Sequence, residues 1–260
     1  MKKPHITIIK VGGAVVENND SLQQLLQQFA QISGAKLLVH GGGRTATAMA
    51  SQLGMESHMV NGRRVTDADM LKVVTMVYGG LVNKHIVAML QAMGLPAIGL
   101  TGADADLIRA HRRPITHGVD YGFVGDVDRV NSYALHRLLQ QGLVPVMAPL
   151  THDGNGTMLN TNADTIASSL AVALTNFYDV ELVYCFEKKG VLSRADDDNS
   201  VIPVITPDSF VQLQTDGVVA GGMIPKLQNA VNAVKQGVPQ VRITSAKELL
   251  EQGTIIREKA

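Results

Sequence analysis

Short apolar segments alternate with longer amphipathic segments along most of this chain. The segments "ITIIKV", "KLLVH" and "AIGL" have the length and the β-branched content of buried strands. Between them lie stretches of helical period from Ser21 to Ile32, from Arg44 to Leu53 and from Asp67 to Met93. Parallel strands need a crossover segment, and a helix is the usual one. The pattern therefore predicts an α/β fold in which helices cover a mostly parallel sheet.

The second half of the chain continues this pattern with two interruptions. The segment 106–131 is rich in turn residues and predicts a hairpin over the edge of the sheet, and 193–205 is expected to be a polar loop. If there are two lobes, the joint is expected near Thr175 to Asp179, between a helix and a strand. Further strands are predicted at "VPVMA" and "ELVYC", and further helices at Ser132–Gln141, Ala163–Thr175, near Asp208 and at Ile224–Lys235.

Composition limits the kind of partner. The 260 residues are 45% apolar and include 25 glycines, which fits a globular protein with a substantial core. Lys and Arg (23) balance Asp and Glu (23), so no overall field attracts nucleic acid or an anionic membrane, and a small-molecule partner is expected. No segment is expected to approach the roughly 20 apolar residues of a membrane span. Cys185 is the single cysteine, which excludes an internal disulfide and indicates a reducing compartment, so we predict a cytoplasmic protein.

Glycines mark the predicted carboxyl ends of the first two strands. Gly12 and Gly13 follow "IIKV", and Gly41 to Gly43 follow "LLVH" directly before a helix. Ligands of open α/β sheets bind at this edge, where glycine lets backbone N–H groups approach an anion at the positive end of a helix. Glycine pairs also occur simply because they permit tight turns. A third cluster, "AGGMIPK", favours a site for a ligand with separated anionic parts.

Familiar nucleotide and hydrolase motifs do not account for these turns. "GGGRTA" satisfies G-x-G-x-x-A, but Asp67, the acidic residue at the right distance, opens a helix instead of ending a second strand. "HGGG" occurs in lipase oxyanion loops, yet the chain contains no G-x-S-x-G motif. A Walker A loop and HExxH are missing from the sequence as well. The turns therefore indicate phosphate binding outside the usual nucleotide-binding classes.

Six segments, taken in order, resemble the motifs of the amino acid kinase family, and within it the N-acetylglutamate kinases of arginine biosynthesis: "IIKVGGAVV", "LLVHGGG", "VNGRRVTD", "YGFVGDV", "LNTNAD" and "GGMIPK". The third and fifth together distinguish the acylglutamate kinases from the carbamate, aspartate and uridylate members. The resemblance covers most of the chain. It implies an open αβα sandwich with an acylglutamate-binding and dimerisation lobe at 1–175, an ATP-binding lobe at 176–260, and a homodimer formed through the first lobe.

The reaction that this resemblance implies is transfer of the γ-phosphoryl group of ATP to the side-chain carboxylate of an N-acylglutamate, giving an acyl phosphate. A glutamate carboxylate, with a pKa of about 4.3, is ionised at neutral pH and needs no general base. The reaction instead needs cations that offset the repulsion between two anions and align them. The matching residues are Lys10 and Lys226, with Asp164 expected to hold both ammonium groups. Asn162 and Asp164 also have a purely structural interpretation as helix caps.

The resemblance also assigns the rest of the acceptor site. Arg64 is expected to clamp the α-carboxylate through two hydrogen bonds, the geometry that a carboxylate favours. Its neighbour Arg63 is expected at a solvated hairpin edge. The other expected acceptor-binding residues are Asn160, Asn162, Gly42 and Gly43, and the phosphoryl group is assigned to Gly12 and Gly13.

The nucleotide lobe departs from the family at one turn. Most members have Thr/Ser-Asp-Val-x-Gly where this chain has "FEKKGVL". Glu187 is expected to reach the position of the missing aspartate, and Lys188 or Lys189 to contact ATP phosphates. The full set of expected ATP-binding residues is Glu187, Lys188, Lys189, Gly190, Val191, Leu192, Gly221 and Gly222. Mg²⁺ is expected to arrive with the nucleotide, and no metal site of the protein itself is predicted.

Two other functions stay open at the level of the sequence. A non-catalytic amino-acid or nucleotide sensor of the same fold would lack Lys10, Asp164 or Lys226, and all three are present. A kinase for another small acid or for uridylate would have a basic nucleotide pocket in place of "NGRRVTD". Arginine-inhibited members of the family carry an additional amino-terminal helix that builds hexamers. In this sequence the predicted strand with Lys10 begins almost at once, so we expect a dimer that is insensitive to arginine.

The acyl group is N-acetyl by default, and N-succinyl is the alternative. A succinyl carboxylate is costly to bury without a cation. The predicted hairpin "RAHRRPITH" offers Arg109, Arg112 and Arg113 as partners, whereas exposed arginine clusters are also common at solvated edges. The sequence leaves both interpretations open.

Overall fold

The computed structural model describes residues 2–60, 62–194, 196–221, 223–251 and 253–259. Its helices are α1 (Gly13–Glu17), α2 (Asn19–Gln31), α3 (Gly43–Gln52), α4 (Ala68–Val74), the π-helix η1 (Thr75–Val82), α5 (Asn83–Ala92), the short η2 (Asp104–Asp106), α6 (Ser132–Gln140), α7 (Ala163–Leu174), α8 (Pro207–Thr215), α9 (Met223–Lys235) and η3 (Ala246–Glu248). Its strands are β1 (His5–Val11), β2 (Ala35–His40), β3 (Met59–Val60), β4 (Arg63–Arg64), β5 (Ala97–Leu100), β6 (Ile108–Arg112), β7 (Gly125–Val130), β8 (Val144–Met147), β9 (Leu150–His152), β10 (Met158–Asn160), β11 (Asp179–Phe186), β12 (Val204–Ile205), β13 (Gln240–Ser245) and β14 (Thr254–Ile256).

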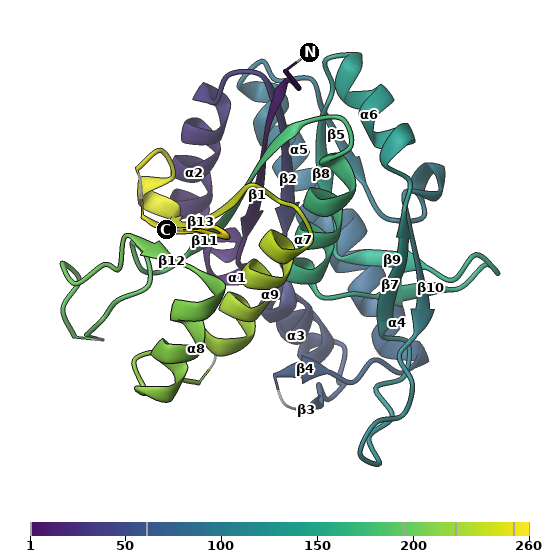
Figure 1. Ribbon diagram of the computed structural model, residues 1–260. Coiled ribbons are helices and arrows are strands. Elements are labelled where there is room, and N and C mark those ends of the chain that lie inside the picture. The colour runs from purple at the N-terminus through teal and green to yellow at the C-terminus, as the bar shows by residue number, and fades with distance from the viewer. Residues whose placement is uncertain (1, 61, 195, 222, 252, 260) are drawn as a thin grey trace.

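An eight-stranded sheet forms the centre of the molecule, in the order β12-β14-β13-β11-β1-β2-β8-β5. Neighbouring strands run parallel except for β13 and β14. Helices lie on both sides of this sheet (Figure 1). The predicted α/β fold with a mainly parallel sheet is therefore confirmed.

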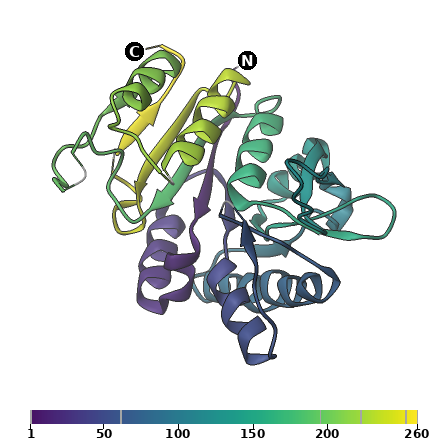
Figure 2. The same ribbon diagram turned by 90° about the horizontal axis from the view of Figure 1, so that it is seen from below.

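The two faces of the sheet bury separate cores. Along β1, Ile6 and Ile8 point to one face and pack with residues of α6, α7 and α9. Ile9 and Val11 point to the other face and pack with residues of α2, α3, α4 and α5. This alternation follows from the two-residue period of a strand. Figure 2 shows the molecule from below, with helices on either side of the strands.

A smaller sheet lies beside the central one and has the order β10-β9-β6-β7. Strands β6 and β7 pair antiparallel, so the hairpin predicted within 106–131 is confirmed. Its parallel contact with β9, and the pairing of β9 with β10, were not predicted from the sequence. The smaller sheet carries Asn160, at the end of β10, to the edge where β1 and β2 end. It is visible at the right of Figure 1.

A continuous helical stretch, Ala68–Ala92, joins α4, η1 and α5. It has 25 residues, and an 18-residue window within it has a mean hydropathy of 1.4, which by length and composition is enough to cross a membrane. The expectation that no segment approaches this limit was wrong. A core helix passes the same test, and the inward residues Val73, Val77 and Ile86 are buried against the sheet.

The expected joint between two lobes coincides with a change of element. Helix α7 ends at Leu174 and β11 begins at Asp179. Strand β11 then pairs with β1 from His5 to Val11, so the central sheet runs across the joint. The division into lobes at 1–175 and 176–260 remains a prediction.

Candidate active site

The glycine turns after β1 and β2 lie against each other. The amide of Gly41 donates to the carbonyl of Val11 at 3.0 Å. A Cβ atom on Gly41 would lie 3.1 Å from the nitrogen of Gly13, and one on Gly13 would lie within 3.9 Å of the nitrogens of Gly42 and Gly43. Glycine at 41 therefore allows the two turns to meet, and backbone N–H groups from both gather at the carboxyl edge of the sheet.

Lys10 continues the alternation of β1 and faces α7, as Ile6 and Ile8 do. Its Nζ lies 2.7 Å from Oδ1 of Asp164, in the first turn of that helix, and both side chains are more than four-fifths buried. Oδ1 receives no aligned hydrogen bond from the described residues, so this contact is a charge–charge contact. An ion pair held in this way keeps the ammonium group at a fixed place at the end of β1.

Lys226 reaches the same place from the first turn of α9. Its Nζ lies 4.2 Å from the ring centroid of Phe186, and Nζ of Lys10 lies 5.8 Å from that centroid. Burial lowers the pKa of Lys226, and the charge of Lys10 lowers it further. Within the described part of the chain, the carboxylate of Asp164 forms an ion pair within 4.0 Å with Lys10 and not with Lys226. Asp164 thus contacts the ammonium group of Lys10, and its expected hold on both ammonium groups stays a prediction.

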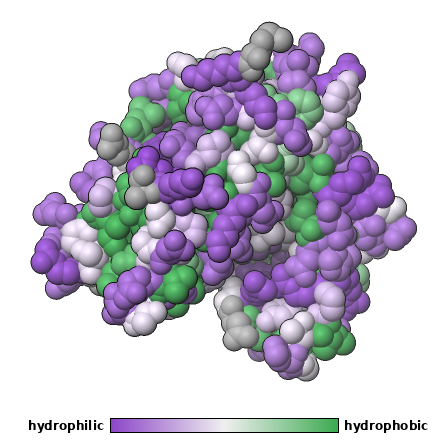
Figure 3. Space-filling view, viewed as in Figure 1, coloured by the Kyte–Doolittle hydropathy of each residue, from purple (hydrophilic) through white to green (hydrophobic). Residues whose placement is uncertain are grey.

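A hollow of about 440 Å³ opens beside the two lysines. In the space-filling view, the lower edge of the molecule is hollowed between the region of α8 and α9 and the region of α3 and β4 (Figure 3). Its lining includes Lys10, Gly12, Gly13, Gly43, Arg44, Phe186, Glu187, Lys188, Gly190 and Lys226. The expected phosphoryl-binding glycines and part of the expected ATP-binding turn thus share one cavity with both lysines.

The two lysines of the turn "FEKKGVL" are paired with carboxylates of the protein. Lys188 lies 2.6 Å from Asp198, and Lys189 lies 2.9 Å from Glu248. Lys188 lines both this hollow and a neighbouring one of about 500 Å³, which Lys189 and Glu187 also line. The charge available for ATP phosphates is therefore partly offset at this turn.

The other expected ATP-binding residues lie away from these hollows or outside the described residues. The side chain of Val191 is buried in the core, and Leu192 forms a bridge with Val201. Gly221 is in the turn before α9 with φ +56°, a conformation that favours glycine. Gly222 lies outside the described residues. No group of three or more His, Cys, Asp or Glu side chains is placed to hold a metal ion in the ranges that the structure describes.

A second hollow lies on the other side of Gly43. It is lined by all five residues that were expected to bind the acceptor, Gly42, Gly43, Arg64, Asn160 and Asn162, and also by Arg63, Tyr78 and Arg113. Gly43 borders this hollow and the one beside the lysines. Gly43, at the start of α3, is therefore part of the wall of both cavities.

Arg64 is buried and already bonded to the protein. Its Nη1 donates to Ser57 at 2.8 Å, and its Nη2 donates to the carbonyl of Gly43 and to Thr47, both at 2.7 Å. Both Nη atoms of the guanidinium are therefore already bonded to the protein. The expected clamp on the α-carboxylate requires that some of these hydrogen bonds be exchanged for bonds to the substrate. Arg63, which was expected at a solvated edge, is exposed but lines the acceptor hollow.

The two asparagines have different local roles. Asn160 donates from Nδ2 to Thr66 at 2.9 Å, and its Oδ1 accepts no hydrogen bond from the residues that the structure describes. Asn162 caps α7, because its Oδ1 accepts from the backbone nitrogens of Asp164 and Thr165. The structural interpretation of Asn162 is therefore confirmed, while its side chain also borders the acceptor hollow.

Tyr78 is the main site residue that the sequence did not indicate. It lies in η1, and its ring would lie 3.0 Å from a Cβ atom on Gly42. Burial raises the pKa of its hydroxyl group. A π-helix often marks a functional position, but it depends on tertiary packing and has no simple sequence signature.

Comparison with known proteins decides the family. The model of the amino acid kinase family matches residues 5–245. This chain belongs to the amino acid kinase family. It is 63% identical over 257 residues to a protein named acetylglutamate kinase from Phocaeicola vulgatus, covering 98% of this chain and 100% of the relative. It is 61% identical over 254 residues to a protein of the same name from Bacteroides thetaiotaomicron, covering 97% of this chain and 98% of the relative.

A crystal structure from Streptococcus mutans UA159 superposes with a TM-score of 0.79 at 30% identity, covering 98% of this chain and 99% of that chain. Relatives that are 61% and 63% identical over nearly the whole chain are named kinases, so this family member is a kinase, for which ATP is the phosphoryl donor. The resemblance drawn from the six motifs is therefore confirmed at the level of the family.

Proposed function

We propose that this protein transfers the γ-phosphoryl group of ATP to the side-chain carboxylate of an N-acylglutamate, as a step of arginine biosynthesis. The names of the relatives support the acceptor, since proteins 61% and 63% identical are named acetylglutamate kinase. The observation that carries the proposal is that two hollows share Gly43 as a wall, one lined by amides and arginines and the other by two lysines. An acceptor held in the first would present its carboxylate to a phosphoryl group held in the second.

The chemistry requires charge and alignment instead of proton transfer. The acceptor carboxylate is an anion at neutral pH, so its attack on phosphorus needs no general base. Lys10 and Lys226 offset the repulsion between this anion and the phosphoryl oxygens, and the N–H groups of Gly12 and Gly13 donate to those oxygens. Asp164 holds Lys10 in place at 2.7 Å and removes no proton.

We propose that ATP lies beside Phe186 and Gly190, with its triphosphate directed toward Lys226. Mg²⁺ then enters as part of the nucleotide, because this ion is usually held by one or two carboxylates together with substrate phosphates. Glu187 lines both the hollow beside the two lysines and the neighbouring hollow of about 500 Å³, and we propose that its carboxylate contacts this ion. We also propose a cytoplasmic location, in keeping with the single cysteine of the chain, Cys185, which permits no internal disulfide.

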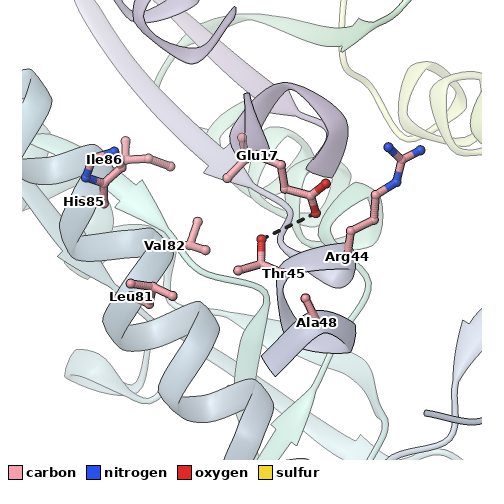
Figure 4. A pocket seen from close by; sticks show the side chains of 9 residues that line it. Glu17, Arg44, Thr45, Ala48, Leu81, Val82, His85 and Ile86 are labelled. Carbon is pink, nitrogen blue, oxygen red and sulfur yellow. Dashed lines mark hydrogen bonds between the residues drawn. The ribbon is translucent and has the colours of Figure 1, made fainter. Parts of the chain in front are cut away.

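We propose a homodimer that forms through the first lobe. Met76 and Leu81, two large apolar residues on η1, are 56% and 53% exposed. Leu81 also lines a cavity of about 460 Å³ between η1, α5 and α3 (Figure 4). Leu81, Val82, Ile86 and Ala48 border it, and Arg44 extends away from this apolar side. A second copy of the chain would cover such a face with the same face.

The proposal is tested by ADP release in a coupled assay. ADP should form with N-acylglutamates and not with aspartate, carbamate or UMP. Lys226→Ala should lower kcat roughly 10²-fold or more, the usual cost of one electrostatic donor at a preorganised site. Lys235→Ala removes an exposed lysine from the last turn of the same helix and should leave kcat unchanged. Turnover with another acid in place of N-acylglutamates would contradict the proposal, as would a normal kcat for Lys226→Ala.

A further inference from the structure

Three arginines of the β6–β7 hairpin, those of the segment "RAHRRPITH", have different surroundings. Arg109 lies 3.0 Å from Asp106 and its side chain is 44% exposed. Arg112 lies 3.1 Å from Asp120 and is 51% exposed. Arg113 is 14% exposed and is the one of the three that lines the acceptor hollow. The hairpin therefore directs a single arginine toward the substrate.

The guanidinium of Arg113 is held firmly but incompletely. Its Nε and Nη2 donate to the carboxylate of Asp126 at 3.1 and 2.5 Å, and it lies 5.5 Å from the ring centroid of Tyr121. Its Nη1 is buried and has no hydrogen-bond partner among the described residues. A buried guanidinium nitrogen without an acceptor is costly, and most buried polar atoms in native proteins are bonded. The unpaired nitrogen therefore indicates that an acceptor is supplied by the ligand.

The charge around the acceptor hollow supports the same conclusion. Its charged lining residues are Arg63, Arg64 and Arg113, and Asp126 pairs with the last of them. Three positive charges and one negative charge leave two positive charges. The side-chain carboxylate of the acceptor is directed to Lys10, so its α-carboxylate offsets only one of the two. A second anionic group in this hollow would balance the charge and occupy the open position on Arg113.

We propose that Arg113 selects an N-acyl group that itself ends in a carboxylate, so that N-succinylglutamate is preferred to N-acetylglutamate. This inference rests on the proposed function, because it concerns the acyl group of the same acceptor. Nη1 of Arg113 donates to the terminal carboxylate, and Asp126 keeps the guanidinium in place. An acetyl group has no oxygen at that position and leaves Nη1 unpaired. A charged hydrogen bond lost in this way costs more than a neutral one.

The test compares kcat/KM for N-succinylglutamate and N-acetylglutamate in the parent, Arg113→Ala and Arg112→Ala. The parent should prefer the succinyl substrate by about tenfold or more. Arg113→Ala should lower the succinyl value roughly 100-fold and the acetyl value only a few-fold, because only the first substrate has a partner for Nη1. Arg112→Ala, which removes an exposed arginine from the same hairpin, should change neither value more than about twofold.

Three results would overturn the inference. The first is a parent with the higher kcat/KM for the acetyl substrate. The second is an Arg113→Ala variant whose kcat/KM falls by the same factor for both substrates. The third is an Arg112→Ala variant whose kcat/KM values change as those of Arg113→Ala do. If Arg113→Ala does not fold, Arg113→Lys keeps the charge and should still lose part of the preference. Turnover of N-acetylglutamate without a succinyl preference refutes this inference alone. Absence of turnover with both acyl substrates in a folded parent refutes the proposed function.

Discussion

His40 should make the stability of this protein fall steeply in weak acid. The imidazole is fully buried at the end of β2, directly before the glycines that form the floor of the acceptor hollow. Its Nδ1 lies 2.8 Å from the carbonyl of Gly41, to which it donates. Its Nε2 lies 3.1 Å from Nδ2 of Asn83 and accepts from it, while the same amide donates to the carbonyl of Val146 at 2.9 Å. Both ring nitrogens are therefore satisfied only when the ring is neutral.

A protonated His40 ring would lack a hydrogen-bond acceptor at Nε2 in this arrangement. A proton on Nε2 would face the amide N–H groups of Asn83, and turning that amide over would set its oxygen against the carbonyl of Val146. Burial accordingly lowers the pKa of His40 from 6.5 to about 4, and the charge of Lys84 contributes in the same direction. Between these values the unfolded chain binds more protons than the folded one, so stability is complete above pH 6.5 and decreases as the pH falls toward 4. The difference corresponds to about 3 kcal/mol.

The assay is urea unfolding of the parent and of His40→Gln at several pH values from 7.5 to 4. Other groups also titrate in this range, so the quantity of interest is the difference between the two curves of unfolding free energy. His58→Gln, which removes an exposed imidazole, is the matched control. The advantage of the parent over His40→Gln should shrink by about 3 kcal/mol between pH 7 and pH 4. Parallel curves would refute the account of His40.

Four further predictions concern the site and the assembly. Lys10→Ala should lower kcat roughly 10²-fold with a smaller change in substrate affinity, and Asp164→Asn should lower kcat while keeping the shape of the pH–rate profile; a new ionisation in that profile would contradict the role of Asp164. Leu81→Glu should convert a dimer into a monomer by light scattering, and a parent that is monomeric at micromolar concentration would exclude the proposed interface. Gly42→Ala sets a methyl group 3.0 Å from the ring of Tyr78, so KM for the acceptor should rise roughly tenfold while KM for ATP changes little; equal changes in both would argue against this wall of the hollow.

The sequence predicted most of the fold because strands and helices have different hydrophobic periods. The long helix expected from Asp67 to Met93 corresponds to Ala68–Ala92, but its central π-helix was not foreseen. That irregularity turns Tyr78 toward Gly42 and depends on packing between segments distant in sequence. The same holds for the smaller sheet, whose strands β6 and β9 are about 40 residues apart.

The site was predictable in its members and less so in its contacts. Motif positions brought Lys10 and Asp164 together as expected, because alternation along β1 points the lysine at the first turn of α7. The bonding of Arg64 to its own surroundings could not be read from "NGRRVTD". Nor could the sequence tell which arginine of "RAHRRPITH" faces inward, since that depends on the register of β6 and β7 and on the position of Asp126.

Transfer of oxygen label tests the central claim most directly. The acceptor, an N-acylglutamate labelled with ¹⁸O in its side-chain carboxylate, is incubated with ATP and the protein, and the product is observed by ³¹P NMR before and after hydroxylamine is added. If Lys10 and Lys226 direct the carboxylate to the γ-phosphorus, an acyl phosphate with ¹⁸O in the bridging position forms and hydroxylamine converts it to the hydroxamate. ADP formation without a labelled acyl phosphate would contradict the account.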